Sequence, residues 1–459
     1  MFRDLTEFHA WFDERHRANA YRVVPTALDD LQGWLVEPET GNIRHRSGRF
    51  FRVEGLRVHT DNRSVNSWEQ PIIVQPEVGI LGILTKDFGG VPHCLMQAKM
   101  EPGNINLLQL SPTLQATRSN YTRVHDGASV PYLDYFLSPD RDRVVFDALQ
   151  SEQGSWFLCK RNRNMIVRAE GDVPVREDYC WLSLRQLGEL LREDNVINMD
   201  TRTVLSGMSS LAGPGGGVGG RRHRPADDRG PDVGAMHTTE QILSWFTETK
   251  TRHRLERELI PLAQVRQWVR EPYRIAHEQN RHFSVIGVDV QATNREVAQW
   301  SQPMVAPRGR GLVAFVGREI NHGFHVLVHA RTEAGSFDVV EIAPTVQCIP
   351  DSYRDVPDAV RPTYLDYVLN ARPEQHLLDV VLSEEGGRFY HAENRYLVVN
   401  SGDDLPVEAP EGFLWMTLAQ LANLVPYSNY LNVSTRSLLS CLHSEWWSES
   451  LTGPTLVRA

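Results

Sequence analysis

The sequence predicts an α+β protein that consists of two tandem copies of one domain, each a mixed, mainly antiparallel sheet with helices around it. The first indication is an internal repeat: "LLQLSPTLQAT" at 107–117 returns as "VVEIAPTVQCI" at 339–349, with proline, threonine and glutamine at matching places. The second is that each copy begins with a helical pattern and continues with short alternating strands. Because the repeat unit is as long as a whole domain, we expect a duplicated domain and not a solenoid.

The repeat sets the expected domain limits at 1–212 and 235–459. Between the copies, "GPGGGVGGRRHRPADDRGPD" is rich in glycine, proline, arginine and aspartate and has too few apolar residues to pack. We therefore expect 213–234 to be a flexible linker between two domains that each bury a core.

Helices are expected at 4–18 and 238–256, where apolar residues recur every three to four positions. Shorter helical patterns cover 132–137 and 181–193. The first helix should pack through the apolar stripe formed by Leu5, Phe8, Trp11 and Phe12.

Strands are expected at 50–60 and 282–292, where apolar and polar residues alternate. The stretch 79–101 predicts a hairpin with its turn at 86–90, because two glycines there allow a tight reversal. One more strand follows at 104–111.

The composition excludes several classes of protein. The net charge is −10, which argues against general binding of nucleic acid. The five cysteines show no metal-finger spacing, so we expect them to be reduced in a cytoplasmic protein. The N-terminus has no signal-peptide pattern, and no apolar run is long enough to span a membrane. We therefore expect no interaction with a membrane.

One strand in each copy should carry a polar face. Every second side chain of a strand shares a face, so Cys94, Met96, Ala98 and Met100 should face the core. The opposite face contains His93, Leu95, Gln97, Lys99 and Glu101, and the second copy repeats it with His325, Leu327, His329, Arg331 and Glu333. The next strand adds Gln109 and Ser111 and leads to the repeated pairs Thr113/Gln115 and Thr345/Gln347. Two interpretations remain open: a solvated face with a surface ion pair, or a site for chemistry.

Other groups allow two interpretations each. Trp68 begins the motif "WEQP" and Trp300 begins "WSQP", so each lies just before a glutamine–proline pair. Each tryptophan either stacks on a nucleobase or fills a core. The cluster "KRNRN" at 160–164 is either a solvated charge run or a diphosphate clamp. His325 and His329 would lie about 13 Å apart on a strand, so metal ligation is not expected. No phosphate loop or dinucleotide fingerprint occurs, and we expect neither a metal nor a cofactor.

Several long motifs resemble the NDP-hexose 2,3-dehydratase family. They are "QAKMEPGNINLLQLSPTLQATRSNY" at 97–121, "QSEQGSWFLCKRNRNMIV" at 150–167, "NMDTRTVLSGM" at 198–208 and "WVREPYRIAHEQNRHFSVIGVDVQATNREV" from Trp268. The resemblance implies a substrate of the dTDP-4-keto-6-deoxyglucose type, a homodimer and duplicated Nudix-like domains, although the Nudix hydrolase signature is absent. It also implies a downstream 3-ketoreductase that acts on the product. The second copy departs from the motif, with Ala334 in place of Pro102 and Ser336 in place of Asn104.

The expected chemistry follows from the substrate. A ketone at C4 acidifies the proton on C3, and its removal lets the C2 hydroxyl leave; the enol then becomes a 3,4-diketone. We expect Glu101 to act as the base and Lys99 as the donor to the enolate oxygen or as the acid. The expected substrate-binding residues are Trp68, Gln97, Asn104, Gln109, Ser111, Thr113, Gln115, Arg118, Asn120, Tyr121, Arg161, Arg163, Asn164, Trp300, Arg331, Glu333, Thr345, Gln347, Asn394 and Arg395.

Two other classes remain as alternatives: a nucleotide-diphosphate hydrolase and a non-catalytic module that binds a sugar nucleotide. The two copies should also have divided their work. Arg331 replaces Lys99 in the second copy, and a guanidinium does not deprotonate in proteins. We therefore expect two bound nucleotides per chain, with chemistry within 1–212 and a vestigial site within 235–459.

Overall fold

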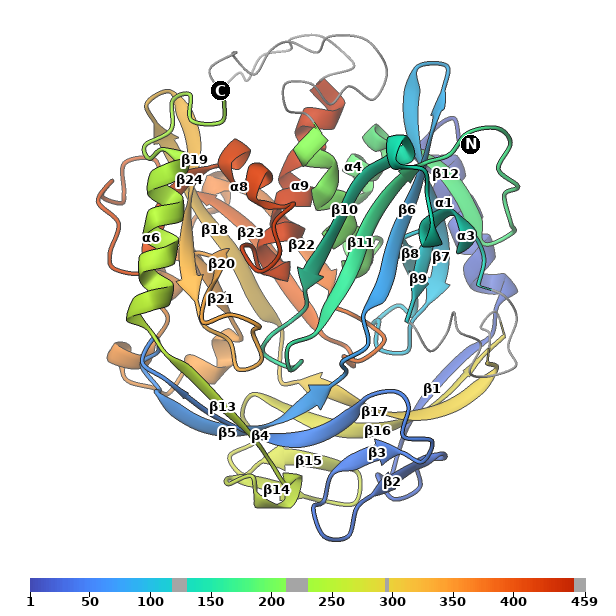
Figure 1. Cartoon of the computed structure of the whole chain (residues 1–459), viewed down its shortest axis with the longest axis vertical. Helices are drawn as coiled ribbons and strands as arrows, with labels where there is room; N and C mark the ends of the chain where they lie inside the picture. Colours follow the sequence, from blue (N-terminus) through green and yellow to red (C-terminus); the bar gives the residue numbers. More distant parts are fainter. Residues whose placement is uncertain (118–129, 212–229, 294–296, 450–459) are drawn as a thin grey trace.

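The computed structural model describes residues 1–117, 130–211, 230–293 and 297–449, and four sheets are formed by them. Most of the expected linker, and three expected binding residues (Arg118, Asn120 and Tyr121), lie outside the described residues. Figure 1 shows two larger sheets side by side, with helices between them and two smaller sheets together at the lower end. The predicted α+β class with two repeated regions is confirmed.

Each repeat contributes one large mixed sheet. The first contains β10 (Val144–Ser151), β11 (Arg161–Arg168), β6 (Gly79–Phe88), β7 (Val91–Met100) and β12 (Tyr179–Ser183), with β8 (Leu108–Ser111) on β7 and β9 (Leu114–Ala116) on β6. Its counterpart contains β22 (His376–Ser383), β23 (Glu393–Asn400), β18 (Gly311–Ile320), β19 (Gly323–Arg331), β20 (Glu341–Pro344), β21 (Val346–Cys348) and β24 (Phe413–Thr417). In each sheet one pair is parallel, β11 with β6 and β23 with β18, and the other pairs are antiparallel.

The two smaller sheets are formed by both repeats. One contains β2 (Trp34–Val36), β3 (Ile43–His45), β4 (Arg52–Thr60) and β5 (Ser67–Val74), and β13 (Leu255–Ile260) of the second repeat pairs with β4. The other contains β14 (Trp268–Arg270), β15 (Arg274–His277), β16 (Phe283–Ala292) and β17 (Gln299–Pro307), and β1 (Tyr21–Thr26) of the first repeat pairs with β16. The repeats therefore exchange a strand, which the sequence pattern did not predict.

The first helix of each repeat begins where its sequence predicts. Helix α1 (Leu5–Ala18) is capped by Asp4, and α6 (Thr239–Arg252) by a capping box of Thr238 and Gln241. Phe8 and Phe246 lie on the apolar stripes of these two helices and are buried. The remaining helices are α3 (Asp134–Leu137), α4 (Leu184–Leu190), α5 (Met199–Leu205), α7 (Leu365–Leu369), α8 (Leu418–Leu424) and α9 (Val433–Glu449), and short 3-10 turns occur at Arg141–Arg143, Ser206–Leu211, Leu262–Gln264, Pro350–Tyr353, Asp358–Val360 and Pro373–Gln375.

One hydrophobic core joins the two large sheets. It contains side chains from both repeats, such as Phe8 and Leu205 of the first and Phe315 and Leu438 of the second. Figure 1 shows α4, α8 and α9 in the space between the sheets, where this core lies. The strand exchange and the shared core make the two repeats one interlocked unit.

Four local predictions differ from the structure. The helix expected over 238–256 ends at Arg252, because β13 begins at Leu255, and the strand expected over 104–111 begins only at Leu108. The helix expected over 181–193 begins only at Leu184, because Trp181 and Leu182 pair with β7 as part of β12 and Ser183 caps the helix. The hairpin turn is also shorter than expected: β6 continues to Phe88, and the reversal uses the positive φ angles of Gly89 and Gly90 (64° and 86°). In the part of the chain that the structure describes, no helix is long and apolar enough to span a membrane.

Candidate active site

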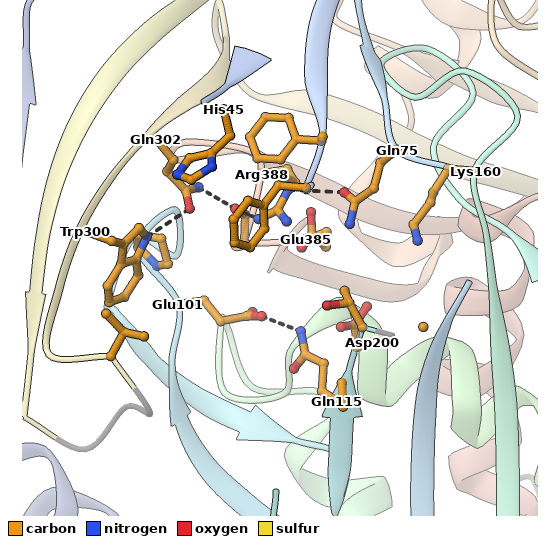
Figure 2. A pocket seen from close by; sticks show the side chains of 18 of the residues that line it. His45, Gln75, Glu101, Gln115, Lys160, Asp200, Trp300, Gln302, Glu385 and Arg388 are labelled. Atoms are coloured by element: carbon orange, nitrogen blue, oxygen red, sulfur yellow. Dashed lines mark hydrogen bonds between the residues drawn. The ribbon is translucent and has the colours of Figure 1, made fainter. Parts of the chain in front are cut away.

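A cavity of about 550 Å³ lies where the first large sheet meets both small sheets. One side is formed by the ends of β7 and β9, which carry Lys99, Glu101 and Gln115. The second repeat contributes β17 and the loop after β22, so neither repeat forms this cavity alone. Figure 2 shows its side chains directed toward one space.

Lys99 and Glu101 lie on the same face, as the strand period predicts, and both are buried, with 8% and 3% of their surface exposed. Gln115 Nε2 donates a hydrogen bond of 2.6 Å to Glu101 Oε1, and Lys99 Nζ donates one of 3.1 Å to Gln115 Oε1. Asn104 and Asn198 donate to Glu101 Oε2 at 3.3 and 3.4 Å. Amide donors therefore orient the Glu101 carboxylate from two sides.

Three further carboxyl groups line the same cavity. Glu152 follows β10, Asp200 lies in the first turn of α5, and Glu385 comes from the loop after β22 in the second repeat. Burial raises the pKa of Asp200 well above its usual range, and the charges of Glu101, Glu152 and Glu385 raise it further. Burial likewise raises the pKa of Glu152, and that of Glu385 to about 8. Burial and the like charges within one site therefore both oppose the ionisation of these three carboxyl groups.

Two cations lie beside these carboxyl groups. Lys160 Nζ donates to the carbonyl oxygen of Glu77, and burial lowers the pKa of Lys160. Arg388 comes from the second repeat, and its Nε donates to Gln75 Oε1 at 3.2 Å. The Arg388 guanidinium also lies 4.3 Å from the centre of the Phe51 ring.

The opposite wall is aromatic. Trp300 Nε1 donates to Gln302 Oε1 at 3.0 Å, and Gln302 Nε2 donates to the carbonyl oxygen of Gly387 at 2.6 Å. Figure 2 shows Trp300 and His45 on the side of the cavity away from Lys160 and Asp200. This wall presents an indole ring and a polar edge, an arrangement that suits a nucleobase.

The loop that carries Glu385 is fixed against the loop that carries Glu101. Gly103 N donates to the carbonyl oxygen of Gly386 at 2.7 Å, and His391 N donates to that of Gly103 at 2.7 Å. A side chain at Gly103 would place Cβ 1.8 Å from the carbonyl oxygen of Phe389, so only glycine allows this approach.

A second cavity, of about 690 Å³, is formed by the repeat equivalents of these residues. Trp68 Nε1 donates to Gln70 Oε1 at 2.8 Å, and Gln347 Nε2 donates to Glu333 Oε1 at 3.0 Å. Arg331, the equivalent of Lys99, also lines this cavity. The duplication has therefore produced two pockets of related architecture.

The acid–base groups differ between the cavities. Ser434 replaces Asp200, Gln153 replaces Glu385, and Trp156 replaces Arg388. Ala392 stands where the first cavity has Lys160. The cluster of three further carboxyl groups and two cations is therefore complete only in the first cavity.

Comparison with known proteins agrees with this duplicated arrangement. The family model of the NDP-hexose 2,3-dehydratases matches residues 5–208 and again 239–442. The chain belongs to the NDP-hexose 2,3-dehydratase family. A dTDP-4-dehydro-6-deoxy-alpha-D-glucopyranose 2,3-dehydratase of Streptomyces violaceoruber is 56% identical over 96% of this chain and 97% of its own length. Enzymes of the same name from Saccharopolyspora spinosa and Amycolatopsis orientalis are 49% and 47% identical over 96% and 95% of this chain, and over 92% and 90% of their own lengths.

Within this 2,3-dehydratase, the residues expected at the site divide into groups. Lys99, Glu101, Gln115 and Trp300 line the first cavity, and Trp68, Arg331, Gln347 and Asn394 line the second. Glu333 lies beside the second, where it accepts hydrogen bonds from Gln347 and from Ser155 Oγ at 2.9 Å. Their roles toward a ligand stay predictions.

Several expected binding residues form hydrogen bonds within the framework. Thr113 and Thr345 accept hydrogen bonds from the backbone N–H groups of Leu84 and Val316 at 2.8 and 2.9 Å and donate to carbonyl oxygens of their own sheets. The internal repeat at these threonines is therefore explained by the fold.

Other polar side chains bond within the protein as well. Asn104 supports Glu101, Ser111 accepts from Asn198 Nδ2 at 2.9 Å, and Gln109 donates to Ser383 Oγ at 2.7 Å. Asn164 is fully buried and donates to Thr203 Oγ1 at 3.1 Å, and Gln97 is half-buried on β7.

The expected diphosphate clamp at 160–164 is divided by the strand alternation. Lys160 and Asn162 line the first cavity, whereas Arg161 and Arg163 are not among its lining residues. The Arg161 guanidinium lies 4.1 Å from the centre of the Phe337 ring. Arg163 forms two hydrogen bonds with Asp147, and Arg395 forms two with Asp379 in the second repeat.

Sequence reasoning missed Glu152, Asp200, Glu385 and Arg388. A signal for Glu385 was present, because "SEQG" at 151–154 becomes "SEEG" at 383–386. This sequence difference indicates a site residue only once it is known that the strand exchange brings this loop to the first cavity.

Proposed function

We propose that the chain removes water from a dTDP-4-keto-6-deoxyhexose, giving a 3,4-diketo-2,6-dideoxy sugar nucleotide. The observation that carries this proposal is the first cavity, in which Lys99, Glu101, Asp200 and Glu385 face one space beside Trp300. Three relatives that carry the name of this dehydratase match at least 95% of the chain, which supports the same assignment.

The first step is removal of the C3 proton by Glu101. The electron pair of the C3–H bond forms a C3–C4 double bond, and the C4 oxygen becomes an enolate. Lys99 donates to that oxygen, and a preorganised donor of this kind contributes about 3–4 kcal/mol to the transition state. Gln115 accepts a hydrogen bond from Lys99 and donates one to Glu101, so one network orients both groups.

The second step is departure of the C2 hydroxyl. The enolate re-forms the C4 ketone, the electrons form a C2–C3 double bond, and the hydroxyl leaves as water after receiving a proton. The resulting enol loses its O3 proton and gains one at C2, so the product is a 3,4-diketone. No electrons are transferred to another molecule, and the reaction needs only acid and base groups.

The chemistry belongs to the first cavity. The expectation that it lies within 1–212 needs a correction, because Trp300, Glu385 and Arg388 of the second repeat also line that cavity. The second cavity keeps Trp68 and Gln347 and is proposed to bind a nucleotide without turnover.

A direct assay tests this function. The protein is incubated with dTDP-4-keto-6-deoxyglucose and EDTA, and a 3-ketoreductase with its nicotinamide traps the unstable diketone. We expect a reduced 2,6-dideoxy sugar nucleotide to accumulate. If the sugar loses no water while the nucleotide still binds, the chain is a binding module and the assignment fails.

Other parts of the proposal concern the surroundings of the enzyme. We expect a homodimer, measurable as twice the chain mass by light scattering, in the cytoplasm with a 3-ketoreductase that consumes the reactive diketone. The mixed sheets are consistent with a Nudix-like ancestor for each repeat. Superposition of each large sheet with its helices on Nudix folds tests that relationship.

A further inference from the structure

The repeat equivalents show how two side chains meet across each cavity. In the second cavity, Gln153 Nε2 of the first repeat donates a hydrogen bond of 2.5 Å to Glu384 Oε2 of the second. Glu384 Oε1 accepts from Asn394 Nδ2 at 2.6 Å and from the Tyr396 hydroxyl at 2.6 Å. One oxygen of Glu384 is thus held by its own sheet, and the other bonds to the opposite repeat.

The first cavity has a related frame, although Asn164 stands in the place of Tyr396 and donates to Thr203 instead. Glu152 is the equivalent of Glu384, and its Oε1 accepts from Asn162 Nδ2 at 2.7 Å. Glu385 stands in the place of Gln153. By repeat equivalence, the carboxyl group of Glu385 takes the place of the Gln153 amide near a carboxylate; burial raises the pKa of Glu385, and the charge of Glu152 raises it further.

One oxygen of each carboxyl group has no hydrogen-bond partner among the described residues. Glu152 Oε2 and Glu385 Oε2 are buried and accept no hydrogen bond from the described residues. In the second cavity the atom equivalent to Glu152 Oε2 receives the amide proton of Gln153. A single proton between Glu152 and Glu385 would satisfy both oxygens, whereas two bare carboxylates in this position would repel each other.

The surrounding charges agree with a retained proton. Burial raises the pKa values of both carboxyl groups, that of Glu385 to about 8. The charge of Glu384 raises the pKa of Glu152 further, and the charge of Glu101 raises that of Glu385. The positive groups near the pair are Arg388, Lys160 and Arg436, which lower these pKa values.

We propose that Glu152 and Glu385 share one proton and that this pair is the general acid that protonates the departing C2 hydroxyl. The inference rests on the proposed dehydration and deepens it. Both residues line the cavity that contains Glu101, and the proton they share is separate from the one that Glu101 takes from C3. The pair donates its proton to the hydroxyl as the C2–O bond breaks, and the proton later lost from O3 restores the pair. The proton on Glu101 exchanges with solvent, and Glu101 then delivers a solvent-derived proton to C2.

This assignment also explains one of the substitutions that distinguish the two cavities. A glutamine at 153 makes the same hydrogen bond to its partner but cannot act as an acid. The acid is therefore formed only where the second repeat supplies Glu385 to the first repeat's Glu152.

The test is Glu385→Gln, which recreates in the first cavity the amide–carboxylate pair that the second already contains. Folding should be retained because Gln153 occupies the equivalent frame. Water loss and exchange of the C3 proton with D₂O are measured together by NMR. We expect kcat for water loss to fall by about 10²–10⁴, as loss of a general acid does, while C3 exchange continues. In the variant, the alkaline limb of the pH–rate profile should also shift or disappear relative to that of the wild type.

Three outcomes decide the question. If Glu385→Gln eliminates water at the wild-type rate with the same alkaline limb, or if it stops C3 exchange together with elimination, the proposal is overturned. If wild-type protein exchanges C3 without losing water, the proposed function fails instead. Glu152→Gln provides a second variant with the same expectation should Glu385→Gln not fold, and Glu189→Gln on the exposed face of α4 is the control for a carboxylate-to-amide change.

Discussion

Replacing Glu101 with glutamine tests the base assignment. Glu101 Oε1 accepts from Gln115, and Oε2 accepts from Asn104 and Asn198. A glutamine has almost the same shape but only one acceptor oxygen, so one neighbouring amide must turn, at about 1 kcal/mol of folding stability. The lost base should lower kcat by about 10²–10⁴, or about 2.7–5.4 kcal/mol of transition-state stabilisation.

The assay compares Glu101→Gln with Glu333→Gln, its equivalent beside the second cavity. Turnover is followed through the trapped product, and dTDP binding by calorimetry shows whether the cavity is intact. We expect turnover to fall only with Glu101→Gln and dTDP binding to persist. A Glu101→Gln enzyme with near-wild-type kcat would refute the base assignment, and an equal loss from Glu333→Gln would place chemistry in the second cavity.

Three further predictions follow from the same arrangement. Lys99→Met should abolish turnover and Arg331→Met should not, with two dTDP bound per wild-type chain by calorimetry; loss of turnover only with Arg331→Met would reverse the roles of the cavities. The pKa of Glu385 is raised to about 8, so the folded protein holds this proton while the unfolded chain, with an ordinary pKa of about 4.3, loses it. The stability that this proton contributes is therefore complete at low pH and is lost as pH rises through about 8. Glu385→Gln lacks this pH dependence, so its Tm should rise relative to that of the wild type between pH 5 and 9. Parallel curves of Tm against pH for the two proteins would contradict the retained proton. Residues 1–211 expressed alone should be insoluble or molten, because β4 lacks β13 and the shared core is exposed; a cooperative, monomeric unfolding transition would disprove the interlocked fold.

Sequence periodicity predicted the local part of the site. The alternation along 93–101 correctly placed Lys99 and Glu101 together, because a strand exposes every second side chain to the same side. It also correctly placed Cys94, Met96, Ala98 and Met100 in the buried core. The two-residue period contains this information without any knowledge of tertiary structure.

The remaining part of the site depends on contacts between the repeats. Glu385 and Arg388 reach the first cavity because the repeats exchange strands and the loop after β22 packs against Gly103. No local pattern predicts such a pairing. Thr113 and Thr345 both accept backbone hydrogen bonds, and a sequence repeat alone does not distinguish such a bond from a ligand contact.

The central claim is that this chain eliminates water from the sugar at the first cavity, and mass spectrometry of the sugar nucleotide after incubation in D₂O tests it most directly. The account predicts a product that has lost one water and gained deuterium at C2, formed by wild-type protein and by Arg331→Met but not by Glu101→Gln. Cleavage of the diphosphate, an unchanged sugar nucleotide, or the same product from Glu101→Gln at the wild-type rate would contradict it.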